Sequence, residues 1–479
     1  MGAIVAALDK KGEDAHSTSL TMLEELRHRG TKNPIVVEQP LTFVSQFLNE
    51  SERRKIHSKV AIGSNSSDPI IGENYVLILD GRFFPPVASR IHQVMHEMAR
   101  QPLKKARLIL ERLNGSYVFA LGFSDQIIVG RDTMGTKPLY YGENEYVCAV
   151  ASERKALWKI GIVNARSFPP GNLATMNQTG FGFEPISTLA PVAKRKMGIA
   201  EAANRLRKLL EKSTRNRVSD VKNVGVAFSG GLDSAVISSL AKLAGANVRP
   251  ICVGLEGESE TNHAIEAAER LGLQLSVQEY SVADVENSLP KVLWLIEEPN
   301  TMKAGVAVPF FWTAKVASKL GLTTLLAGQG ADEIFGGYSK YLVEYTRGGA
   351  ESAEEAMFRD TTMSYDTNFQ RDDAVCAYHK VELRLPFADI EVARFGLSLP
   401  IDLKIKSPQD SLRKRVLRLT ARKIGIPAFI ANRPKRAIQF ASGVDGAIEE
   451  LAKVRGLTKR SYINEVFRKV YPDLGVKNG

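Results

Sequence analysis

A glycine-containing hexapeptide in the second half of the chain has the residue types that bind phosphate. Residues 229–234, SGGLDS, follow an apolar run at 224–228 and precede a helical pattern at 235–244. Two glycines let the backbone approach an anion closely, and amide groups at a helix N-terminus favour negative charge. The spacing and the lysine of a Walker loop are absent. The alternative interpretation is a plain glycine turn in which Asp233 and Ser234 cap the helix.

A second glycine-rich segment, with two adjacent acids, occupies residues 327–338, AGQGADEIFGGY. It follows an apolar run at 323–327. Because parallel strands present their carboxyl ends at one edge of a sheet, we expect both segments at the same edge. Hard carboxylate oxygens, as in Asp332 and Glu333, suit Mg²⁺. The pair of segments therefore predicts a site for phosphate and metal, with a glycine-rich surface loop as the alternative for the second.

The elements that must position these segments differ between the two halves of the chain. Residues 1–190 contain short apolar runs separated by turn residues, which predicts a layered α+β domain. A linker is expected at 185–198, and from 221 onward apolar runs alternate with helical patterns, which predicts a parallel sheet with crossover helices. Residues beyond about 350 are expected to be mostly helical. The expected strands are residues 4–8, 35–37, 75–79, 116–121, 127–129, 146–149, 224–228, 248–253, 275–280 and 323–327, and the expected helices are 17–29, 88–100, 199–215, 234–244, 261–271, 282–296 and 309–320.

Length and composition narrow the class of protein. A chain of 479 residues is too long for one ordinary core, so two or three domains are expected, and 44% hydrophobic residues are typical of a globular protein. No apolar run reaches the ~18 residues of a membrane span, and the apolar start lacks the basic lead-in of a signal peptide. The three cysteines are too few for a four-cysteine zinc site, and reduced thiols fit a cytoplasmic protein.

The net charge of +11 suits a polyanionic ligand such as ATP. Its densest basic stretches, at residues 194–196, 205–217 and 413–436, are interpreted as solvated helix faces, which makes nucleic acid an unlikely partner. His92 and His96 are four apart on an expected helix, a spacing that can bind metal, but with no third ligand in view they are interpreted as part of a polar face.

The hexapeptide resembles the pyrophosphate loop of the N-type ATP pyrophosphatases, and the rest of the chain resembles the asparagine synthetase family. The second segment, the LRLPFAD run at 383–389 after Glu382, and the NRPK run at 432–435 all match that family. The resemblance implies a Rossmann-like α/β synthetase domain at 198–479, and a cleavage of ATP between its α- and β-phosphates. It implies ATP and Mg²⁺ as cofactors.

The resemblance also implies roles for single residues. Asp233 and Asp332 would bind Mg²⁺-pyrophosphate, Lys435 would stabilise charge on the phosphates, and Tyr338 is a candidate phosphate contact. The other residues carried over to the nucleotide site are Ala227, Phe228, Ser229, Gly230, Gly231, Leu232, Ser234, Val253, Ala327 and Gly328.

Residues 1–190 resemble the class II glutaminase domain of the same family, which implies an Ntn-hydrolase-like sandwich. Arg27-His28-Arg29-Gly30 and the GRD run at 130–132 match it. Active members carry a nucleophilic cysteine directly after the initiator methionine, where this chain has Gly2. Their Asn-Gly-Glu segment aligns with residues 80–82, DGR. We therefore expect a degenerate glutaminase fold without glutaminase activity.

The chain also departs from the family at the residue that would act on the incoming amine. The family usually has glutamate where Gln329 stands, and an amide cannot take up a proton. The leading hypothesis is an AMP-forming ligase that adenylates aspartate or an analogue and transfers it to ammonia. The alternatives are an amide ligase for another carboxylate and amine, similar to the β-lactam synthetases, and a nucleotide-binding scaffold without turnover. Oligomeric state stays open, with a homodimer as one candidate.

Overall fold

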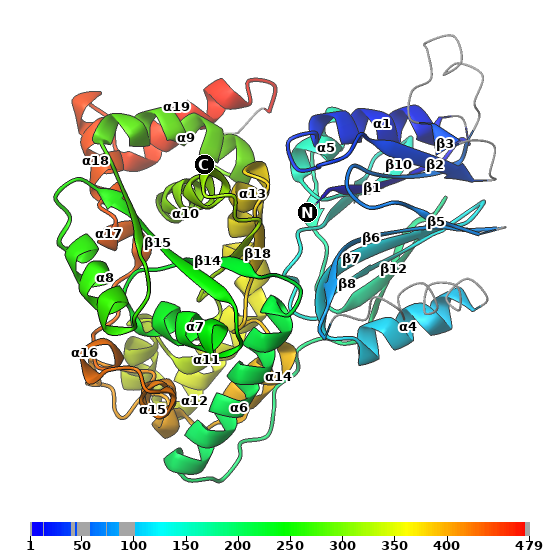
Figure 1. The fold of residues 1–479 in the computed structure, drawn as a ribbon. Coiled ribbons are helices and arrows are strands. Elements are labelled where there is room, and N and C mark those ends of the chain that lie inside the picture. The colour runs from blue at the N-terminus through cyan, green and yellow to red at the C-terminus, as the bar shows by residue number, and fades with distance from the viewer. Residues whose placement is uncertain are drawn as a thin grey trace. The chain divides into compact units, whose positions relative to one another are not determined.

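The computed structural model describes residues 2–12, 14–39, 44–45, 58–72, 74–85 and 101–474 (Figure 1). Its contacts divide the chain into two compact units, Met1–Leu189 and Ala190–Gly479. Each unit is considered by itself. Among the helices of the described ranges, none is both long and apolar enough to cross a membrane.

The first unit is built on two antiparallel sheets that pack face to face. The seven-stranded sheet has the order β11-β9-β10-β1-β4-β2-β3, and the six-stranded sheet has the order β13-β12-β8-β7-β6-β5. The strands are β1 Ile4–Asp9, β2 Ile35–Gln39, β3 Val44–Ser45, β4 Val60–Ser64, β5 Ile70–Ile71, β6 Val76–Phe83, β7 Gly115–Gly122, β8 Ile127–Arg131, β9 Tyr140–Glu143, β10 Val147–Ala151, β11 Arg166–Ser167, β12 Asn172–Asn177 and β13 Gly180–Pro185.

Strand β1 explains why the N-terminal run is apolar at every position. Ile4, Ala6 and Leu8 face the core between the two sheets, where β7 and β8 contribute Val118 and Val129. The alternate residues of β1 face helices α1 (Ala15–Glu25) and α5 (Arg154–Lys159) on the outer side, and α4 (Pro102–Arg112) packs on the other sheet. Successive side chains of a strand point to opposite faces, and both faces of β1 are buried, so each of residues 4–8 is apolar.

Most expected elements of the first unit are present, with shifted ends. Helix α1 ends at Glu25 and not near Arg29, and the Arg29 side chain in the turn that follows is fully buried. Helix α4 was not expected. The predicted helix at 88–100, with His92 and His96, lies outside the described residues.

The second unit confirms the predicted parallel sheet. Five strands have the order β16-β15-β14-β17-β18, and every neighbouring pair is parallel. The strands are β14 Asn223–Ala227, β15 Asn247–Leu255, β16 Ser276–Tyr280, β17 Thr324–Leu326 and β18 Glu382–Arg384. The helices are α6 Ile199–Val218, α7 Leu232–Leu243, α8 Ser259–Arg270, α9 Val282–Ile296, α10 Thr301–Lys319, α11 Ala331–Phe335, α12 Lys340–Ser364, α13 Gln370–Tyr378, α14 Ile390–Ser398, α15 Arg415–Ile424, α16 Ala428–Ala431, α17 Ile438–Ala441, α18 Val444–Val454 and α19 Lys459–Val470, with a π-helix at Tyr365–Phe369 and a 3₁₀-helix at Ile401–Leu403.

Two elements of this unit differ from expectation. Strand β18 lies in the region expected to be helical, and only three residues long it is too short to show a pattern. Helix α10 was expected to begin at Pro309 but begins at Thr301, where the Asn300 side chain accepts a hydrogen bond from the Lys303 amide. Pro309 lies inside it, because burial of the surrounding apolar side chains outweighs the missing amide.

Candidate functional site

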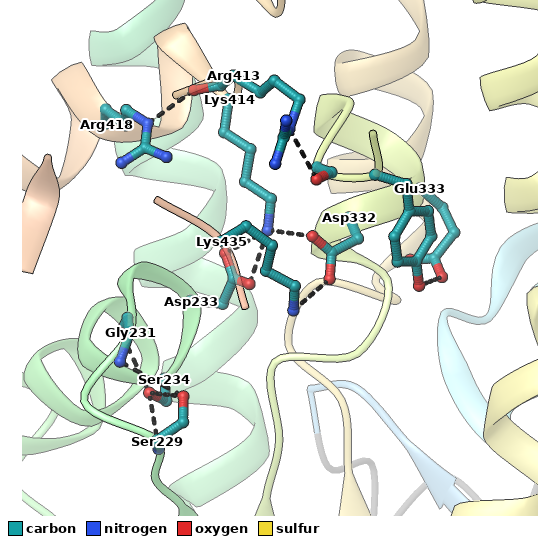
Figure 2. Close-up of polar contacts among 12 residues, drawn as sticks. Ser229, Gly231, Asp233, Ser234, Asp332, Glu333, Arg413, Lys414, Arg418 and Lys435 are labelled. Atoms are coloured by element: carbon teal, nitrogen blue, oxygen red, sulfur yellow. Dashed lines mark hydrogen bonds and ion pairs between the residues drawn. The ribbon is translucent and has the colours of Figure 1, made fainter. Parts of the chain in front are cut away.

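The phosphate loop connects β14 to α7 at the carboxyl edge of the parallel sheet. Gly230 has a φ of +68°, and its carbonyl lies 3.0 Å from Nε2 of His263 on α8. The Ser234 hydroxyl lies 3.4 Å from the Ser229 amide and donates to the Gly231 carbonyl at 3.2 Å (Figure 2). The helix begins without a side-chain cap, so the interpretation of Asp233 and Ser234 as capping residues is not supported.

Two aspartates and two lysines meet beside this loop. Lys414 Nζ lies 2.8 and 2.7 Å from the two carboxylate oxygens of Asp233 and 2.7 Å from Asp332. Lys435 Nζ lies 2.8 Å from the other oxygen of Asp332. Figure 2 shows Lys414 reaching between the two aspartates. The structure therefore brings together Asp233, Asp332 and Lys435, which were predicted from separate motifs, and adds Lys414, which was not.

The charges in this cluster support one another. Burial by itself would favour the neutral acid at Asp332, but Lys414 and Lys435 outweigh it and hold the pKa of Asp332 well below its ordinary value. Burial opposes the charge of Lys435 too, and Asp332 and Asp233 outweigh it, which raises the lysine pKa. Asp332 and Lys435 are thus both held in their charged forms at neutral pH.

The segment that carries Lys414 explains why sequence reasoning missed it. Arg413, Lys414 and Arg418 belong to the basic stretch that was interpreted as a solvated helix face, and all three are buried, so that interpretation is wrong for them. Arg413 and Lys414 have φ values of 52° and 51°, an unusual conformation for residues other than glycine. Lys414 immediately precedes α15 and lies outside it, so no helical periodicity in the sequence marks it.

Gln329 belongs to the second glycine-rich segment, where it precedes Asp332. Its side-chain amide donates to Asp372 at 2.5 Å, and Asp372 is paired with Arg371 at 2.8 Å. Burial raises the pKa of Asp372 despite Arg371. The Gln329 amide is thereby fixed by a carboxylate, an arrangement that glutamate could not make without a shared proton.

Glu333 and Tyr338 form a separate pair. The Tyr338 hydroxyl, a candidate phosphate contact, donates to Glu333 at 2.6 Å, and Asn368 donates to the same carboxylate at 2.7 Å. Burial and the charge of Asp332 raise the pKa of Glu333. These contacts support a structural role for Glu333.

A pocket of about 530 Å³ joins these groups. Its lining includes every residue predicted for the site except Gly230, Gly231 and Leu232, which belong to the phosphate loop itself. A Cβ on Gly328 would lie 2.9 Å from Cβ of Asp233, so only glycine allows the two motifs to approach this closely. Apolar residues of the lining, among them Ile251, Val306 and Phe310, were not predicted. The pocket is thus lined by both charged and apolar side chains.

In the first unit, the surroundings of Gly2 were predicted to lack a nucleophile. A Cβ added to Gly2 would lie 1.5 Å from the Ser66 hydroxyl oxygen, and the Gly2 carbonyl accepts a hydrogen bond from Arg29 at 3.0 Å. The space that a side chain at position 2 would need is therefore filled by Ser66.

A buried charged cluster lies near Gly2. Glu153 pairs with Arg29 at 2.8 Å, with His28 at 3.0 Å and with Lys155. Burial lowers the pKa of His28, which favours the neutral imidazole. The His28 imidazole is thus part of this buried cluster through Glu153.

Comparison with known proteins gives consistent matches. The family model described as asparagine synthase matches residues 205–351 and 343–473, and the model described as glutamine amidotransferase domain matches residues 90–159. The chain is 29% identical over 531 residues to the "Putative asparagine synthetase (glutamine-hydrolyzing) 1" of Methanocaldococcus jannaschii, covering 97% of this chain and 98% of that protein. It is 27% identical to asparagine synthetase B (glutamine-hydrolyzing) of Escherichia coli over 71% of this chain and 63% of that protein.

Among solved structures, the glutamine phosphoribosylpyrophosphate amidotransferase of B. subtilis matches 74% of this chain and 92% of that chain, at 14% identity and a TM-score of 0.31. A score this low carries no argument about function.

Proposed function

The chain belongs to the asparagine synthase family, and we propose that it activates a carboxylate as an acyl-adenylate with ATP and transfers the acyl group to ammonia. AMP and pyrophosphate would be released, and aspartate is the first candidate for the carboxylate. The observation that carries this proposal is the cluster of Asp233, Asp332, Lys414 and Lys435, in which Asp233, Asp332 and Lys435 line the pocket.

The chemistry requires charge to be neutralised as pyrophosphate departs. A carboxylate oxygen attacks the α-phosphorus of ATP, and the bond to the β-phosphate breaks. Lys414 and Lys435 are placed to offset the charge on the leaving pyrophosphate, and fixed cations in a water-poor site act strongly because no reorganisation is needed. The phosphate loop would contribute its amides and the hydroxyls of Ser229 and Ser234.

Magnesium fits this cluster only together with a nucleotide. Asp233 and Asp332 offer hard oxygen ligands, which suit Mg²⁺. Among the described residues there is no group of three or more metal-ligating side chains, so ATP phosphates and water would have to complete the coordination. Bound Mg²⁺ would further neutralise the phosphates, while Lys414 would have to share both aspartates with it.

The adenosine would lie in this pocket, whose lining includes Ala227, Val253 and Ala327 together with Ile251 and Phe310. We assign the synthetase domain to residues 198–479 on this basis.

We assign residues 1–190 to a glutaminase-like domain of the Ntn-hydrolase-like type that has lost its activity. The relatives are named as glutamine-hydrolyzing, but Gly2 offers no nucleophile and Ser66 fills the space beside it. Ammonia would then reach this chain from outside its own first domain.

A second candidate is an amide ligase for another carboxylate and amine pair. The observation that favours it is the fixed Gln329 amide, which offers a neutral hydrogen-bonding group where a base would help ammonia.

Both candidates are tested by pyrophosphate release with ATP, Mg²⁺ and aspartate, comparing ammonium with glutamine as donor. Release that requires aspartate and ammonium supports the first candidate. A screen of carboxylates by ATP–pyrophosphate exchange identifies the second, and an absence of exchange with every carboxylate would refute both.

A further inference from the structure

Lys435 is carried by a short segment, residues 432–437, which we call the lysine segment. Within it, Arg433, Lys435 and Arg436 place three cations inside four residues. Such like charges repel one another. If only Lys435 pairs with Asp332, Arg433 and Arg436 need another anion. Glu260, on the first turn of α8, supplies it.

Glu260 binds the two arginines with separate oxygens. Arg433 Nη2 lies 2.8 Å from one carboxylate oxygen, and Arg436 Nη1 lies 3.0 Å from the other. The Glu260 side chain is 15% exposed, so these pairs are partly shielded from solvent. With both arginines held on one side, Lys435 is left to pair with Asp332 at 2.8 Å.

The same helix also contacts the phosphate loop. One turn after Glu260, His263 Nε2 lies 3.0 Å from the Gly230 carbonyl. Helix α8 therefore contacts both groups that would have to surround the phosphates, the loop through His263 and the lysine segment through Glu260. A rigid helix with two such contacts fixes the distance between them.

We propose that Glu260 is a positioning residue that sets Lys435 against Asp332 by holding Arg433 and Arg436. The proposal rests on the function proposed above, because it assigns Lys435 a role at the phosphates. It adds that α8 couples the placement of the lysine to that of the phosphate loop, and that the two arginines serve this placement.

The rival role for Glu260 is direct contact with the nucleotide, since it also lines the pocket. The two roles give different kinetics. A positioning residue acts on the reaction step, so its loss lowers kcat, whereas loss of a uniform binding contact raises KM.

The test compares Glu260→Gln with Glu266→Gln. Glu266 lies on the same helix and pairs at 2.7 Å with Arg270, which is not a residue of the lysine segment, so it controls for the loss of one carboxylate and one ion pair on α8. For ATP–pyrophosphate exchange we expect Glu260→Gln to lower kcat roughly tenfold, with KM for ATP within about twofold of the parent. Glu266→Gln should leave both unchanged.

Two further measurements complete the test. In a Lys435→Ala background, Glu260→Gln should have no further effect on kcat, because the residue through which it acts is gone. Amide hydrogen exchange of residues 432–442, measured without substrate, should be faster in Glu260→Gln and unchanged in Glu266→Gln.

The outcomes separate this proposal from the proposed function. An unchanged kcat, a rise in KM alone, or an effect that persists in full without Lys435 would overturn the positioning role. If the parent protein shows no exchange with any carboxylate, the proposed function fails. The hydrogen-exchange comparison then decides the positioning role by itself: equal rates in the two glutamine variants overturn it.

Discussion

Each unit contains a buried cluster of opposite charges, and the two clusters differ in what surrounds them. In the first unit, Glu153 is enclosed by Arg29, His28 and Lys155, with Glu153 and Lys155 2% and 3% exposed. In the second unit, Lys414 pairs with both Asp233 and Asp332, Lys435 pairs with Asp332, and the two aspartates and Lys435 line a large pocket. The first cluster is buried in the interior of its unit, whereas the second borders space that a ligand can enter.

This difference separates charge that stabilises a fold from charge that is available for chemistry. Glu153 holds together residues from α5 and from the turn after α1, and its neighbours fill the space beside it. Asp233 and Asp332 lie in the first turns of α7 and α11, which follow β14 and β17 of one sheet, and both aspartates line the pocket. Substitutions in the two clusters should therefore affect different measurements.

The largest effect is expected at Asp233. Replacing it with alanine removes a carboxylate from the proposed pyrophosphate site and leaves Lys414 with Asp332 alone. We expect ATP–pyrophosphate exchange to fall about 10³-fold or more. Glu391→Gln, which breaks an exposed ion pair with Lys212 at 2.7 Å, should leave exchange unchanged. Exchange within tenfold of the parent protein in Asp233→Ala would mean that the second cluster is structural too.

The next effect concerns glutamine as a nitrogen donor. The parent protein should release no ammonia from glutamine, and Gly2→Cys alone should not change this, because the new side chain meets Ser66. The clash should also destabilise that variant by about 2 kcal/mol.

Adding Ser66→Gly should recover most of this stability, as measured by thermal unfolding, with Ser66→Gly alone as the control. Ammonia release from glutamine by the parent protein would refute the view that the first unit has lost its chemistry.

A stability effect is expected at Glu153. Its replacement by glutamine removes the Glu153 carboxylate from the buried side chains of Arg29 and Lys155, which should lower the free energy of unfolding by about 3 kcal/mol. Urea denaturation measures this change, and exchange activity per folded molecule should stay constant. Glu143→Gln, which removes an exposed ion pair with Lys10, is the matched control and should lower the free energy of unfolding by less than about 1 kcal/mol. An equal loss of unfolding free energy in the two variants would contradict a special role of the buried Glu153 cluster.

The smallest effect is expected for Gln329→Glu. The new carboxylate would face Asp372, whose pKa is already raised by burial, and the two would share a proton. The folded state would then bind that proton more tightly than the unfolded state. The free energy of unfolding of the variant should fall by about 1 kcal/mol relative to that of the parent protein as pH rises from 4 to 8. The difference between the two proteins should shrink as pH falls.

Thermal unfolding across this pH range measures the effect at Gln329. Gln278→Glu, at an exposed position, serves as the control and should show no such slope. A clear gain in ammonium-dependent activity by Gln329→Glu at neutral pH would show instead that a base is all that this site lacks.

The regular parts of the fold could be predicted because their signals are local. The pattern of neighbouring residues indicates that β1 is buried on both faces. It also indicates that strands alternate with helices from β14 to β17. Strand β18 could not be predicted, since three residues form no period and it is stabilised by pairing with β17. The start of α10 was missed for a related reason, because burial of its first half outweighs the proline that follows.

For the candidate site, the sequence alone determined the two loops, their glycines, and the presence of Asp233, Asp332 and Lys435, because each lies in a motif whose chemistry is local. Only the tertiary structure decided which charges meet. Lys414 is 181 positions from Asp233 in the sequence, and Ser66 is far from Gly2 along the chain, yet each pair is in contact. Such contacts depend on how distant segments pack, and no pattern of neighbouring residues encodes them.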